Sequence, residues 1–170
     1  MISKDEWEWY GNAGHLCVGS DCRFHLCTKI GDFLVSTVGE YVPPEGSREI
    51  LARSRNIVLE GIGDERLHSW LDQNGFEDIG FGRTYETMVF RVDGKCGCGC
   101  GMPKIIPKEI DCYGYNSAID ATKGHHEFCR KIADGTWTCW YCSTTLVNDQ
   151  FGTFCSNEDC ESIDGHNVKD

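Results

Sequence analysis

Hydrophobic and polar positions alternate over residues 22–30, and the neighbouring residues 33–42 are rich in residue types that favour β-strands. Alternation with a period of two is typical of a β-strand that has one buried face. Gly31 and Asp32 separate the segments and suit a two-residue turn between antiparallel strands. The pattern therefore predicts a β-hairpin over 22–42.

Other segments also have the pattern of regular elements. Ser3 and Glu6 form a capping box, which predicts one or two helical turns. Residues 64–73 and 117–133 predict two helices, and residues 85–92 alternate like a strand. The helix over 117–133 has an apolar face that consists of Ala118, Ala121, His125, Cys129 and Ile132.

The character of the chain changes at Cys96, where cysteine and glycine begin to alternate and exclude a regular element. We therefore predict an α+β protein with three regions. Residues 1–94 form a domain with a small antiparallel sheet, residues 95–135 a cysteine-rich loop with a helix, and residues 136–170 a four-cysteine module with a loose tail. The last two regions contain few aliphatic residues, so we expect metal ions to hold them together.

The cysteine content points to metal binding. The chain has 12 cysteines in 170 residues, and its N-terminal residues lack the pattern of a signal peptide. No run of about 18 apolar residues is present, so we expect no membrane span and a cytoplasmic location. In a reducing compartment clustered cysteines are usually metal ligands, and a secreted disulfide framework is the alternative.

The charge is unevenly distributed. The chain carries a net charge of −11, with −6 on residues 1–95, +1 on residues 96–131 and −6 on residues 132–170. A strongly acidic surface disfavours contact with a phosphate backbone. Only the middle region is free of this repulsion.

The clearest metal motif is the pair Cys139 and Cys142, followed after twelve residues by Cys155 and Cys160. Zinc prefers four soft ligands in a tetrahedron, and the intervening residues can form a hairpin that returns the chain to the ion. The segment resembles zinc-ribbon and treble-clef modules, with Phe154 before Cys155 as is usual in a second knuckle. It departs from them in having four residues, not two, between the last two cysteines. Buried free thiols or a redox pair are the alternatives.

A second predicted zinc site combines the glycine-spaced loop with the helix. His125 and Cys129 are four residues apart and therefore share a helix face, and two loop sulfurs would complete a tetrahedron. The preferred set is Cys98, Cys100, His125 and Cys129, with Cys96, Cys112 and His126 as substitutes. The alternative is a buried core histidine beside a buried cysteine.

A third cluster lies near the N-terminus and consists of Cys17, Cys22, His25 and Cys27. These residues suit a further zinc site. A thiolate at Cys27 or Cys22 beside His25 would instead be a usable nucleophile. The cysteines can also simply pack as small hydrophobic residues.

Parts of the chain resemble small uncharacterised proteins of tailed bacteriophages. The resemblance is carried by residues 7–41, the strand 83–91, the segment 111–116, and Gly124-His125 with Cys129. It implies expression in the cytoplasm of an infected bacterium, and it implies no activity.

Three functions remain open at this point. The first is a zinc-stabilised adaptor or inhibitor that binds another protein, because closed sulfur-rich zinc sites are usually structural. The second is nucleic-acid binding through a zinc module, in which Trp137, Trp140 and Tyr141 would stack on bases. The third is a Cys/His-dependent enzyme. The first is preferred, since an acidic surface with aromatic residues suits a protein partner.

Overall fold

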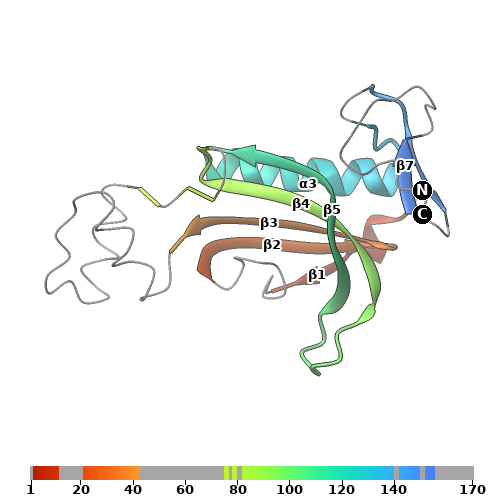
Figure 1. The fold of residues 1–170 in the computed structure, drawn as a ribbon, viewed down its shortest axis with the longest axis horizontal. Coiled ribbons are helices and arrows are strands. Elements are labelled where there is room, and N and C mark those ends of the chain that lie inside the picture. Colours follow the sequence, from red (N-terminus) through yellow and green to blue (C-terminus); the bar gives the residue numbers. More distant parts are fainter. Residues whose placement is uncertain are drawn as a thin grey trace, which may run out of the picture.

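Five antiparallel strands and one long helix make up most of the computed structural model (Figure 1). The structure describes residues 2–11, 21–42, 75–76, 78–79, 82–139, 142–149 and 152–155. The elements are a 3-10 helix Lys4–Glu6, β1 Glu8–Tyr10, β2 Cys22–Ile30, β3 Phe33–Tyr41, β4 Tyr85–Lys95, β5 Pro103–Tyr115, α3 Ala118–Asp134, β6 Leu146–Asp149 and β7 Gly152–Cys155. The predicted α+β class with an antiparallel sheet is confirmed.

The main sheet has the strand order β1-β2-β3-β4-β5. The predicted hairpin over 22–42 is confirmed: β2 and β3 pair from Cys22 opposite Tyr41 to Ile30 opposite Phe33. Gly31 has a φ of +55°, which glycine adopts at little cost in the tight turn. The capping box also forms, but the chain becomes extended immediately afterwards as β1, which pairs with β2.

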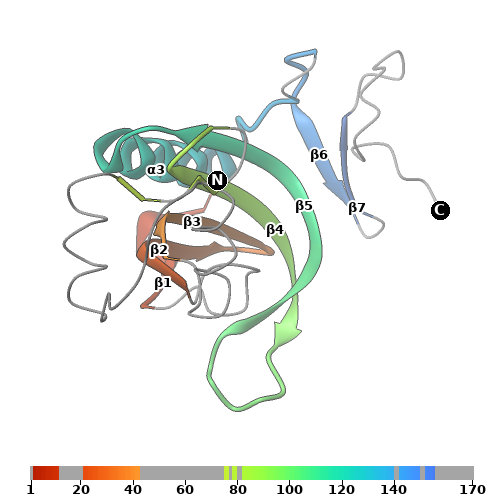
Figure 2. The ribbon, with the colours of Figure 1, turned by 60° about the vertical axis from the view of Figure 1, so that its left-hand side comes forward.

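Strand β4 extends beyond the predicted strand 85–92. The hairpin that it forms with β5 is strongly bent. Its register shifts between Val89 and Phe90, between Phe90 and Val92, and between Val92 and Lys95. Such irregularities increase the local twist and bend a hairpin. The far end of the hairpin therefore curls away from the helix, as Figure 2 shows. Met102, near its tip, packs against the sheet face opposite the helix.

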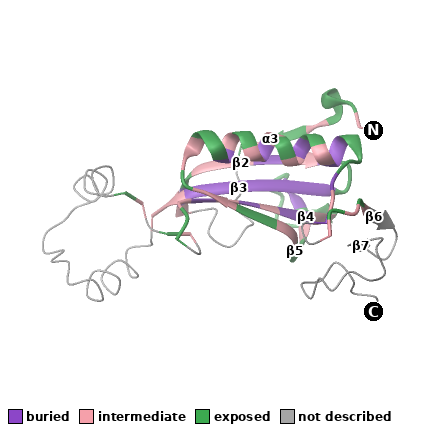
Figure 3. Cartoon of the chain, turned by 90° about the horizontal axis from the view of Figure 1, so that it is seen from above, coloured by how far each residue is buried: buried purple, intermediate pink, exposed green. Residues whose placement is uncertain are grey.

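Helix α3 covers one face of the sheet. The cap is Ser117, one of two candidates in the sequence together with Asn116, because its hydroxyl accepts a hydrogen bond from the Asp120 amide at 3.1 Å. Gly135 ends the helix with a left-handed φ of +67°. The buried side chains of the helix form a stripe toward the sheet, and its opposite side is exposed (Figure 3). Within the described residues no helix is long and apolar enough to cross a membrane.

Two hydrophobic clusters lie on opposite faces of the sheet. The cluster beneath α3 consists of Ile30, Phe33, Val35, Val89, Cys129, Ile132, Ala133 and Trp137. The other consists of Cys22, Cys27, Leu34, Val38 and Met102. The bent hairpin covers this second face, and so a small sheet is buried on both sides.

The predicted region boundary near residue 95 falls at the end of β4. The strands on either side of it are hydrogen-bonded to each other, and α3 packs on β2, β3 and β4. The predicted helix over 64–73 lies outside the described residues, as does the tail after residue 160.

A polar cluster lies in the interface between α3 and the sheet. His125 is fully buried, and its two ring nitrogens lie 2.8 Å from the hydroxyls of Thr28 and Thr37. Thr37 in turn lies 2.7 Å from the hydroxyl of Thr87. Strands β2 and β3 therefore hold the histidine directly, and β4 contributes Thr87, which supports Thr37.

The buried position of His125 makes folding stability depend on pH. Burial, with a smaller contribution from His126, lowers the pKa of His125 from 6.5 to about 3. Unfolding restores the ordinary pKa, so this contribution is complete above about pH 6.5 and is lost as the pH falls toward about 3. We expect the free energy of unfolding to be about 2 kcal/mol lower at about pH 5 than at about pH 7 from this group.

Urea unfolding of the protein and of its His125→Gln variant at the two pH values measures this effect. Loss of metal in acid affects both proteins alike, and the difference between them isolates the histidine. Equal losses of stability in the two proteins would contradict the prediction.

Candidate metal centres

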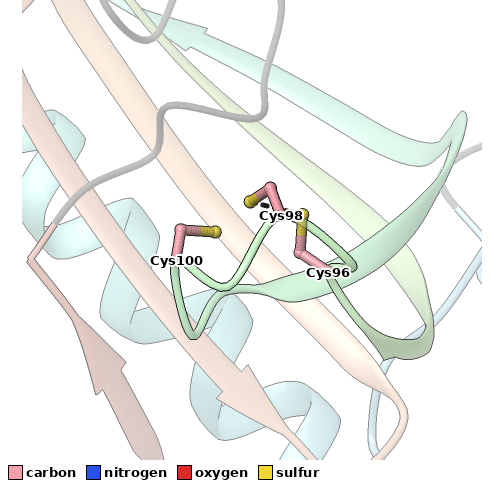
Figure 4. A group of neighbouring side chains, drawn as sticks. All are labelled: Cys96, Cys98 and Cys100. Atoms are coloured by element: carbon pink, nitrogen blue, oxygen red, sulfur yellow. Dashed lines mark hydrogen bonds between the residues drawn. The ribbon is translucent and has the colours of Figure 1, made fainter.

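Three cysteines at the tip of the β4–β5 hairpin lie close together (Figure 4). The sulfur atoms of Cys96, Cys98 and Cys100 are all within 4.8 Å of one another, and those of Cys96 and Cys98 are 3.0 Å apart. Cys96 is half-buried, whereas the other two are exposed. In the part of the chain that the structure describes, these residues form the one group of three potential ligands that could hold a metal ion.

The backbone of the turn explains why the three thiols meet. The Cys96 amide donates a hydrogen bond to the carbonyl of Met102 at 2.9 Å and closes the turn. Gly99 and Gly101 have φ values of +81° and +79°, which side chains other than hydrogen rarely allow. The alternating glycines therefore let a chain segment of seven residues bring every second side chain to one place, as Figure 4 shows.

The electrostatics of this group favour a cation. The thiols of Cys98 and Cys96 form hydrogen bonds with the Cys100 thiol, and these bonds raise the pKa of Cys100 above its ordinary value. Closely spaced thiols resist the loss of successive protons because each new thiolate repels the next. A soft metal ion removes this repulsion, and its binding releases the protons.

A second pair of thiols, Cys139 and Cys142, occupies a tight turn before β6. The Cys139 amide donates to the Thr144 carbonyl, and the Ser143 amide donates to the Cys139 carbonyl, both at 2.8 Å. Ser143 has a left-handed φ of +60°. Cys139 is almost fully buried and packs with Cys142 and Leu146. This pair could also bind a metal ion.

The other two members of the predicted four-cysteine module lie farther along the chain. Cys155 is the last residue of β7, where its backbone pairs with Leu146 of β6. This places Cys155 at the same end of the hairpin as the Cys139 turn, because Leu146 also hydrogen-bonds to Trp137 at 2.9 Å. Cys160 lies outside the described residues.

The predicted set of Cys98, Cys100, His125 and Cys129 is not brought together. Cys98 and Cys100 lie with Cys96 at the hairpin tip, whereas His125 and Cys129 face the interior between α3 and the sheet. Both ring nitrogens of His125 already have threonine partners, which leaves the imidazole no lone pair for a metal. Burial raises the pKa of the Cys129 thiol to about 12. The helical spacing correctly indicated that His125 and Cys129 share one face of the helix, and this face packs into the core.

The two other substitutes are also separate from the hairpin tip. Cys112 lies on β5 opposite Met88, and burial together with the neighbouring Glu86 raises the pKa of its thiol to about 12. His126 lies beside Trp9, with ring centroids 5.6 Å apart. Of the substitutes, only Cys96 joins Cys98 and Cys100.

The N-terminal cluster is described only in part, because Cys17 lies outside the described residues. Cys22, His25 and Cys27 lie on β2 and do not form a common group of potential ligands. The imidazole Nε2 of His25 is hydrogen-bonded to the Gly11 carbonyl. Burial raises the pKa of Cys22 to about 11 and that of Cys27 to about 12, so their thiolates are disfavoured.

Comparison with family models, curated proteins and solved structures finds no match for this chain.

Proposed function

We propose that the chain is a zinc-stabilised binding protein, an adaptor or inhibitor that recognises another protein. Zinc is the first choice of metal because closely grouped thiolates select zinc or other soft ions in a cell. In this proposal the metal ions stabilise turns that hydrophobic burial alone would hold weakly.

The C-terminal hairpin supports a four-cysteine site of the zinc-ribbon type. The turn at Cys139 and Cys142, with its left-handed residue Ser143, lies beside the end of β7 that carries Cys155. Cys160 follows after four residues and would supply the fourth sulfur. Such a set has no open coordination position and would be structural.

The environment of the buried thiols argues against a Cys–His enzyme. A nucleophilic cysteine needs a lowered pKa and access to its substrate. Cys22, Cys27 and Cys129 are buried and have raised pKa values instead. These three residues therefore behave as small hydrophobic side chains of the core.

The observation that best supports a protein partner is the long edge strand β5. Among the described strands none pairs with its outer edge, and it spans Pro103–Tyr115. Two of its large apolar side chains are exposed, Ile106 at 44% and Tyr113 at 58%. A free edge of this length is a template for another extended chain. We infer that the partner adds an extended segment to β5.

Photo-crosslinking in bacterial cells tests this function. A photoreactive phenylalanine analogue at position 106 or 113 should give an adduct with the same protein from both positions. The matched control is the analogue at Lys131, which is exposed on α3. The further variant Ile106→Asp should reduce the adduct from position 113 about tenfold or more, because it places a charge in the buried part of the interface.

The proposal is overturned if position 131 gives the same adduct, if Ile106→Asp leaves the adduct from position 113 unchanged, or if neither strand position gives an adduct.

A further inference from the structure

A hollow of about 470 Å³ lies between the N-terminal segment and the outer side of α3. Residues near the N-terminus form one wall, and five residues of α3 form the other: Lys123, His126, Arg130, Ala133 and Asp134. The Ile2 amide donates a hydrogen bond to the Ala133 carbonyl at 2.7 Å, which fastens the two walls together. The volume is in the range of small-molecule sites.

The rim of the hollow is cationic although the chain carries a net charge of −11. Lys4, Lys123 and Arg130 line it, and Asp134 is the one acidic residue among its lining side chains. Within the described residues none of these three cations forms a salt bridge, although Arg130 interacts electrostatically with Glu127, whereas Lys131 on the same helix pairs with Glu127 at 2.8 Å. Cations that converge on one hollow favour an anionic ligand.

The inner surface of the hollow is apolar and aromatic. Ile2, Ala133 and Trp7 contribute to it, and the Lys4 ammonium lies 5.9 Å from the centre of the Trp7 ring. The indole Nε1 of Trp7 is buried and has no hydrogen-bond acceptor within the described residues. The capping box, in which the Ser3 amide donates to the Glu6 carboxylate at 3.2 Å, fixes the turn that carries Lys4.

We propose that this hollow binds a nucleotide, with phosphate oxygens on Lys123 and Arg130 and the base against Ile2 and Trp7. An apolar floor with a cationic rim matches a ligand that is aromatic at one end and phosphorylated at the other. This site is separate from the thiol groups and from the β5 edge, so the inference goes beyond the proposed protein-binding function. A free nucleotide and the end of a single-stranded nucleic acid share this chemistry.

The proposal is tested by titrating the zinc-loaded protein with AMP. Tryptophan fluorescence and calorimetry measure the binding. We expect saturable binding, a change in tryptophan emission, and weaker binding at higher ionic strength. The double variant Lys123→Ala/Arg130→Ala should bind about tenfold or more weakly, because each charged hydrogen bond contributes substantially to affinity. The matched control Lys131→Ala removes a cation from the same helix outside the hollow and should bind like the parent.

Three further ligands test the base-binding and phosphate-binding parts of the site separately and distinguish a free nucleotide from a nucleic-acid strand. Adenosine and inorganic pyrophosphate should each bind more weakly than AMP, since each lacks one of the two ends. Short single-stranded DNA that binds more tightly than AMP, with the same dependence on Lys123 and Arg130, would support the shared nucleotide chemistry and identify the strand as its source. The proposal is overturned if AMP gives no saturable signal, if the double variant binds as tightly as the parent, or if Lys131→Ala weakens binding equally.

Discussion

Replacing Cys139 with serine should remove one zinc ion per chain and unfold the β6–β7 hairpin. The thiol is almost fully buried and packs with Cys142 and Leu146, and a serine hydroxyl cannot replace it as a soft zinc ligand. Structural zinc contributes on the order of 10 kcal/mol in small zinc-binding peptides, more than a four-residue strand pair can replace. Native mass spectrometry gives the zinc count, and amide hydrogen exchange of residues 146–155 reports the hairpin.

Two matched cysteine variants control this experiment. Cys112→Ser changes a thiol of β5 that belongs to neither group and should leave the zinc count unchanged. Cys98→Ser should remove a different ion, from the hairpin tip, and leave hydrogen exchange of 146–155 unaltered. A Cys139→Ser protein with the zinc count of the parent and a protected hairpin would refute the proposed site.

Truncating His125 to alanine should lower the free energy of unfolding by about 3–5 kcal/mol. The substitution leaves a cavity between α3 and the sheet, and it removes one hydrogen-bond partner each from the hydroxyls of Thr28 and Thr37. Thr37 keeps its contact with Thr87, which limits the loss. Urea unfolding followed by circular dichroism measures the change.

Lys123→Ala, on the exposed side of the same helix, is the control and should change stability by no more than about 0.5 kcal/mol. The zinc count of His125→Ala should equal that of the parent, because the imidazole binds threonines and no metal. Loss of a zinc ion on this substitution would restore His125 as a ligand.

Local patterns predicted the elements that local chemistry specifies. The hairpin over β2 and β3 follows from the alternation over residues 22–30, the turn residues Gly31 and Asp32, and the β-rich residues 33–42, and α3 follows from its Ser117 cap and Gly135 stop. β1 and β5 were not predicted. β1 has only three residues, and β5 contains two prolines, so neither has a clear strand pattern. Both are extended because a neighbouring strand pairs with them, which is a tertiary effect.

The candidate sites likewise contain a part that local sequence predicted and a part that depends on tertiary contacts. The glycine spacing already predicted an irregular loop with Cys98 and Cys100 as metal ligands, and the structure adds Cys96, which was expected only as a substitute, to this group. The assignment of His125 to that turn failed because its hydrogen-bond partners, Thr28 and Thr37, are far away in the sequence. A buried histidine and a metal-binding histidine have the same helical spacing, and only the opposing surface distinguishes them.

The position of the His125 cluster also has a consequence for the order of folding. Thr28 and Thr37 belong to the β2–β3 hairpin, whereas Thr87 and His125 come after the long connection 42–84. Each half of the sheet can form early through contacts that are close in sequence, on the microsecond timescale of hairpins. Pairing β3 with β4 must close the long connection and should therefore be the slow step. The buried histidine joins the two halves, so its contacts should form late and its loss should speed unfolding more than it slows folding.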